Sequence, residues 1–229
     1  MLRELLNLFR SDDAIARMGN DFTRMLDLAQ DLTVRAGHVF FDDKGPSIQG
    51  LEIAKADIEI NKLERHIRKQ VITHLTLSTS RQDVTYCLLL MSLVKDVERL
   101  GDYATNVAEV HDEGGGPLPD DEHAAELRDI RREVEATFSA VAEVFSTSDS
   151  ARAVDLIKHG RVVTGRCDDL ISRVAVSAHD AATTTTLVLG ARYYKRIEAH
   201  LLNILSGVVM PLHKVDYYDE RVVESSEEA

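Results

Sequence analysis

Two acidic side chains, Glu98 and Asp102, have a spacing that places them together on one side of a helix. A four-residue step moves only about 40° around a helix axis, so both carboxylates point in nearly the same direction. Glu98 also follows Val94 at this spacing, which puts the acids on or beside an apolar stripe. Because a bare buried charge is costly, they need a cation, a hydrogen-bond donor or a metal ion.

The elements that carry these acids are predicted to be long helices. Apolar residues recur with a period near 3.6 along the chain, and no strand-like alternation is present. In the first half, we expect one helix after Ser11, Asp12 and Asp13, a second over about 48–77, and a third from about 80 to 113. In the second half, we expect helices from about 121, over about 151–178, and over about 181–210, where Pro211 follows.

The two halves are related by an internal repeat. The segment from Asp83 aligns without a gap with the segment from Asp180, so that Arg99 meets Arg196 and Asn106 meets Asn203. A repeat of about 100 residues indicates duplication of a three-helix unit. We therefore predict an all-α fold of two tandem three-helix bundles, at 1–112 and 122–212, with a Gly- and Pro-rich linker at 113–121 and an acidic tail at 213–229.

Composition and missing motifs exclude several classes of function. The net charge of −12 disfavours attraction to nucleic acid or to an anionic membrane surface. No apolar run has the roughly 20 residues that span a bilayer, and Cys87 and Cys167 form no CxxC pair. No phosphate-binding loop, dinucleotide fingerprint, esterase motif or HExxH pattern occurs. We expect a cytoplasmic, non-enzymatic protein without an organic cofactor or direct membrane insertion.

Two segments of the first half match a known family. The first is DVERLGD at 96–102, continuing to NVAE at 106–109, and the second is DIEINKLE at 57–64. Together they resemble the signature stretches of the PhoU family, regulators of phosphate uptake and phosphate signalling. Asp83 stands where the family has Asp-Leu-Arg, although Thr85 replaces the arginine.

The resemblance implies a metal site on the first bundle. Family members carry paired ExxxD or DxxxD acids, which in some cases hold iron or zinc. The corresponding pairs here are Glu98 with Asp102 and Asp57 with Asn61. Oxygen-only ligation suits hard cations or ferric iron. The alternative is a salt bridge, with Arg99, Lys95 or a basic residue of another helix as the partner.

The second repeat departs from the family pattern. Lys195 stands in place of Glu98 and Ala199 in place of Asp102, while Glu198 falls at the position of Gly101. Thr164 and Asp168 are the best match to the Asp57 stretch. A cationic lysine argues against a metal site on the second bundle.

The resemblance also implies partners. A PhoU-like protein would be a regulatory adaptor that docks on the ATPase of a phosphate ABC transporter, on a sensor histidine kinase, or on both. The alternatives are a metal-binding helical bundle and a PhoU-like regulator of a different ion transporter. The chain is compatible with a homodimer.

Overall fold

A computed structural model describes residues 13–41, 46–78 and 81–216, without the side chains of Asp13 and of residues 46–51. Its long helices are α2 (Asp13–Phe41), α3 (Pro46–Leu77), α4 (Val84–Glu109), α5 (Glu122–Thr147), α6 (Ser150–Ala175) and α7 (Ala181–Val209). A short 3-10 helix, η2 (Leu212–Lys214), follows. The described residues contain no strand, so the all-α prediction is confirmed.

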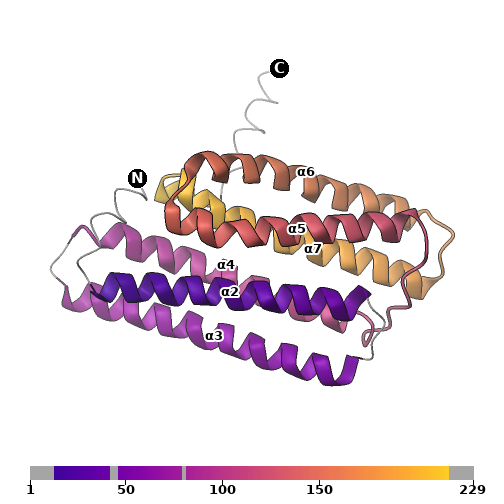
Figure 1. The fold of residues 1–229 in the computed structure, drawn as a ribbon, viewed down its shortest axis with the longest axis horizontal. Helices are drawn as coiled ribbons and strands as arrows, with labels where there is room; N and C mark the ends of the chain where they lie inside the picture. The colour runs from indigo at the N-terminus through magenta and orange to yellow at the C-terminus, as the bar shows by residue number, and fades with distance from the viewer. Residues whose placement is uncertain (1–12, 42–45, 79–80, 217–229) are drawn as a thin grey trace, which may run out of the picture.

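The helices form two bundles that lie side by side (Figure 1). Helices α2, α3 and α4 make one bundle and α5, α6 and α7 the other. The bundles meet where α4 packs on α7 and α2 packs on α5. This is the predicted pair of three-helix bundles. The partition into domains at 1–112 and 122–212 stays a prediction. One apolar core runs through both bundles.

Two helices are shorter than the periodicity predicts. Helix α4, expected over about 80–113, begins after Asp83 and ends at Glu109. The chain turns there, with the Gly115 N–H bonded to the Val110 carbonyl at 2.9 Å. Helix α6 ends at Ala175 rather than near 178. Glycine and short polar residues favour turns over another helical turn.

Aspartates fix the starts of the three helices in the second bundle. One carboxylate oxygen of Asp121, Asp149 and Asp180 accepts a backbone N–H three residues on, at 3.0, 3.1 and 2.7 Å. Each such cap is worth about 1 kcal/mol. Between α5 and α6, Ser148 has a left-handed backbone with φ of 53°. The segment STSDS thus ends one helix and starts the next.

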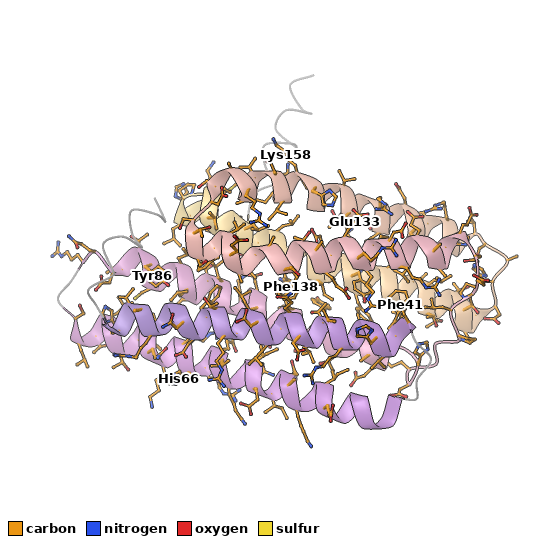
Figure 2. The ribbon with its side chains drawn as sticks, viewed as in Figure 1. Phe41, His66, Tyr86, Glu133, Phe138 and Lys158 are labelled. Atoms are coloured by element: carbon orange, nitrogen blue, oxygen red, sulfur yellow. The ribbon has the colours of Figure 1, made fainter. Side chains whose placement is uncertain are left out.

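The interface between the bundles is mainly apolar, with polar contacts such as the hydrogen bond from Arg131 of α5 to the Gly37 carbonyl of α2. Figure 2 labels Phe138 of α5, which lies between α5 and α2 and is almost fully buried. Between α4 and α7, Asp96 is completely buried and accepts hydrogen bonds from His200 and Asn203, both at 2.8 Å. Lys95 reaches the other Asp96 oxygen at 2.9 Å. Three donors therefore satisfy the buried Asp96 carboxylate.

Two residues inside the predicted acidic tail, Val215 and Asp216, contact the rest of the chain. Val215 is buried, and Asp216 pairs with Lys95 at 3.0 Å. The rest of that tail, 217–229, lies outside the described residues, as do Ser11 and Asp12. No helix in the described ranges combines the length and the apolarity needed to cross a membrane.

Candidate functional site on the α3–α4 face

The predicted acids gather where α3 and α4 pack together. Glu98 and Asp102 of α4 are partly buried, with 21% and 33% of their side chains exposed. Asp57 and Asn61 of α3 are also partly buried. We call Asp57, Glu64, Glu98, Asp102 and Glu109 the acidic patch.

Gly101 lets α3 approach α4 at the centre of this patch. A Cβ atom at this position would lie 2.9 Å from Asp57 Oδ1 and 3.0 Å from Ile60 Cδ1. A glycine inside a helix costs about 1 kcal/mol relative to alanine, so it usually has a packing reason. The lack of a side chain at Gly101 therefore positions the Asp57 carboxylate over α4.

Asp57 is only partly compensated. Asn61 donates its side-chain amide to Asp57 Oδ2 at 3.1 Å. The other oxygen, Oδ1, is buried without a hydrogen-bond partner. An unpaired buried carboxylate oxygen is energetically costly, so this atom is open to a donor or a cation.

The carboxylates of the patch repel one another. Burial raises the pKa of Asp57, and the charges of Asp102 and Glu109 raise it further, against the opposing hydrogen bond from Asn61. Burial also raises the pKa of Glu98, and Asp102, Glu64 and Asp57 add to the effect. Both pKa values shift upward for the same two reasons. Burial is the larger one, and the negative charge of neighbouring carboxylates adds to it.

Arg99 is the cation that the structure places beside α4's acids. Its guanidinium lies 2.7 Å from Asp102 Oδ2 and 3.5 Å from Glu98 Oε2. This is the salt-bridge alternative, formed within one helix. Arg99 is itself more than half exposed, so the pairing is weakly stabilising and does not reverse the raised pKa of Glu98.

The donor set fits a hard cation in chemistry but only in part in position. Asp57 and Glu98 carry raised pKa values that a cation would lower, and Asp57 Oδ1 lacks a partner. However, the Asn61 amide nitrogen faces Asp57 as a hydrogen-bond donor. Among the described residues, a different group brings three ligand atoms within 4.8 Å of one another: Asp121, His123 and His179.

The second bundle has replaced its acid pair with an ion pair. Lys195, at the repeat position of Glu98, lies 2.6 Å from Asp168 Oδ1. Asp168 is the residue that best matches the Asp57 stretch of the first half. The lysine thus neutralises the acid of the facing helix within the bundle.

Two features of the chemistry were not found from the sequence. Asp96 lies in the signature segment, yet it points across to α7 and not into the acidic patch. His179, in a loop, contacts His123, although the two residues are 56 positions apart in the chain. Asp121 lies beside both. Spacing motifs along one helix cannot reveal contacts between segments so far apart.

The fold places the chain among the all-α proteins that consist of two three-helix bundles. The acidic patch lies on the first of the two repeats. Residues 15–110 match the family model described as the PhoU domain. Two curated relatives are named "Phosphate-specific transport system accessory protein PhoU homolog". The one from Synechocystis is 32% identical over 100 residues, 43% of this chain and 44% of that protein. The one from Zymomonas mobilis is 32% identical over 62 residues, 27% of this chain and 25% of that protein.

Solved structures share the fold over a larger part of the chain. The crystal structure of PhoU from Pseudomonas aeruginosa has a TM-score of 0.76 at 20% identity, covering 85% of this chain and 95% of that chain. The structure of the phosphate transport system regulatory protein PhoU from Streptococcus pneumoniae has a TM-score of 0.75 at 15% identity, covering 85% and 92%. The match to the PhoU domain thus covers the first bundle, and the likeness of the rest of the chain to these PhoU structures is one of fold. The matched sequence spans less than half the length of the curated relatives.

Proposed function

We propose that the chain is a non-enzymatic regulatory adaptor of phosphate uptake or phosphate signalling. It would act in the cytoplasm and dock on a phosphate-transporter ATPase, on a sensor histidine kinase, or on both. The observation that carries the proposal is the acidic patch on the family-matched repeat, whose carboxylates exceed the cations that face them.

Electrostatic matching would supply the docking mechanism. Partly buried like charges raise the energy of the isolated surface, and a basic partner surface would relieve that repulsion on contact. Because the patch lies along two packed helices, its charges are held in place before the partner arrives. We also propose that the chain forms a homodimer, and the mass of the assembly in solution tests this.

A metal ion is a second way to relieve the same repulsion. We propose Glu98, Asp102 and Asp57 as ligands for iron or zinc, with Asn61 holding the Asp57 carboxylate. A bound cation would supply positive charge and leave coordination positions for oxygen ligands of a partner. If the acids themselves are the function, the chain is instead a metal-binding bundle.

The deciding experiment is affinity capture of the tagged chain from its host, grown in high and in low phosphate. The proposal expects a phosphate-transport ATPase or a sensor kinase among the captured proteins. A double variant, Glu98→Gln with Asp102→Asn, should weaken capture about tenfold, because the matching charges are gone. Glu59→Gln is the matched control, since Glu59 is an exposed acid of α3 that pairs with Lys62 outside the patch.

The other outcomes separate the alternatives. Capture of a transporter for a different ion would move the function to that transporter while keeping the adaptor mechanism. Capture of neither, together with iron or zinc that the double variant loses, would favour the metal-binding bundle. Equal capture by the double variant would remove the acidic patch as the docking surface.

A further inference from the structure

Three side chains that could bind a metal ion converge at one end of the second bundle, and none of them belongs to the acidic patch. Asp121 caps α5, His123 lies in the first turn of α5, and His179 directly precedes Asp180, the cap of α7. All three side chains are partly buried, with 30%, 14% and 19% exposed in that order.

The three facing atoms form a nearly equilateral triangle. His179 Nε2 lies 3.1 Å from Asp121 Oδ2 and 3.3 Å from His123 Nδ1. His123 Nδ1 lies 3.6 Å from Asp121 Oδ2. A tetrahedral zinc ion, with bonds of about 2.0–2.1 Å, holds its ligand atoms about 3.3–3.4 Å apart. The triangle therefore has the size of one face of such a coordination sphere.

Protons alone cannot satisfy all three contacts. If both imidazoles donate to Asp121 Oδ2, their two N–H groups face each other across the 3.3 Å contact. If His123 donates to His179 instead, a lone pair of His179 faces the carboxylate oxygen. A cation at the centre of the face would accept a lone pair from each of the three atoms at once.

Local structure holds the ligand atoms in place. Asp121 uses its other oxygen, Oδ1, to cap α5 through the Ala124 N–H at 3.0 Å, which leaves Oδ2 for the cluster. The His179 backbone N–H bonds to Ser177 Oγ at 3.4 Å, and Asp180 starts α7 immediately afterwards. The linker is also tied to α7, since the Gly116 N–H bonds to the Ala182 carbonyl at 3.1 Å.

We propose that Asp121, His123 and His179 form a binding site for a zinc-class divalent ion, with a fourth position open to water or to a partner's ligand. Two imidazoles and one carboxylate are the donor set that zinc and its transition-metal neighbours prefer. This set differs from the oxygen-only acidic patch, and all its ligands come from the second half of the chain. A bound ion would clamp the start of α5 to the loop before α7.

The test is Zn²⁺ titration of the full chain after treatment with a chelator, by calorimetry and by competition with a coloured chelator. We expect one ion per chain at this site, and His123→Gln and His179→Gln should each weaken its binding by about tenfold or more. Co²⁺ in place of Zn²⁺ should give the intense visible absorption bands of a tetrahedral site, and each variant should lose them.

Two sets of controls keep the sites apart. His159→Gln is the matched control, because His159 of α6 contacts Glu133 at 3.1 Å outside the cluster and should leave binding unchanged. Circular dichroism of each variant without Zn²⁺ reports folding. No binding at about 1 mM Zn²⁺, or binding that both histidine variants retain, would overturn the proposal. Loss of this ion in the Glu98→Gln, Asp102→Asn variant alone would also overturn it, and would assign the metal to the acidic patch.

Discussion

At the scale of single residues, Glu198 is the most unusual group in the described part of the chain. It is fully buried in α7, at the repeat position of Gly101, and neither of its oxygens meets a hydrogen-bond partner. Burial raises its pKa to about 8; the nearby Thr137 hydroxyl opposes the shift but falls short of hydrogen-bond geometry. The side chain is therefore mainly protonated at neutral pH, and it fills space that the first bundle leaves to a close helix contact.

Glu198 should make stability depend on pH. Its pKa is raised in the folded state, so its contribution is fully present below the unfolded value of 4.5 and is lost as pH rises through about 8. We expect urea denaturation to show less stability at pH 9 than at pH 5, by on the order of 4 kcal/mol from this group. Glu198→Gln should remove that part of the slope, and an unchanged slope in the variant would contradict the assignment.

The acidic patch makes a prediction of its own. Asp102 contributes to the raised pKa of both Asp57 and Glu98. Asp102→Asn should therefore move both pKa values down toward their ordinary range, as measured by NMR titration of the carboxyl carbons. Glu59→Gln should leave them in place. If only burial held them up, the Asp102 variant would show no change.

The sequence predicts contacts between residues of one helix, but not contacts between helices that are far apart in the chain. The four-residue spacing of Glu98 and Asp102 placed both on one side of α4, because helical geometry alone fixes that relation. Asp96 was not predicted as a buried interface residue, because α4 is covered on two sides and the partners His200 and Asn203 belong to the other bundle. The Asp121, His123 and His179 cluster was missed for the same physical reason.

At the scale of helices, a glycine allows close packing between α6 and α7. A Cβ atom on Gly160 would lie 2.6 Å from Leu202 Cδ2 and would overlap a Glu198 oxygen. Alanine here would have to displace the ends of two buried side chains, Glu198 and Leu202. Gly160 thus has the role in the second bundle that Gly101 has in the first.

Gly160→Ala should destabilise the protein by about 1–3 kcal/mol, because the cost of overpacking exceeds the gain in helix propensity. Gly165→Ala is the matched control. Gly165 lies on the same helix, and no other part of the described chain crowds the place where its Cβ would be, so alanine there should stabilise by about 0.5–1 kcal/mol. Chemical denaturation of both variants checks the pair, and equal effects would show that backbone propensity alone decides.

Helix identities were predictable, and helix ends less so. The apolar period agrees with the buried sides of the helices: Ile53, Ile60 and Ile67 recur every seven residues along α3, and all three are buried. The ends depend on single local interactions, such as the turn after Val110 that stops α4 short of the predicted 113. Periodicity averages over many residues and does not resolve such an interaction.

At the scale of the whole molecule, one apolar core joins the bundles through the α4–α7 and α2–α5 contacts. Each bundle contains one cysteine: Cys87 lies on α4 and Cys167 on α6, and both are fully buried. Burial raises the pKa of the Cys167 thiol to about 12, so in the folded state it is unreactive.

We expect the two thiols to become reactive at the same denaturant concentration, because neither bundle can open without exposing the shared core. The measurement is labelling by a thiol reagent along a urea series, in the single-cysteine variants Cys87→Ala and Cys167→Ala. Exposure of one thiol well before the other would show that the bundles unfold as separate units, as the predicted partition at 113–121 implies.

The ion pair between Asp168 and Lys195 has a consequence for stoichiometry. A duplicated protein inherits two equivalent surfaces and would, with both intact, bind two copies of whatever the surface attracts. Here the second copy has its counter-ion built into the chain, while the first retains its surplus of carboxylates. If the acidic patch is the docking surface that we propose, each chain would bind one such ligand, and cross-linking of two ligands would require two chains.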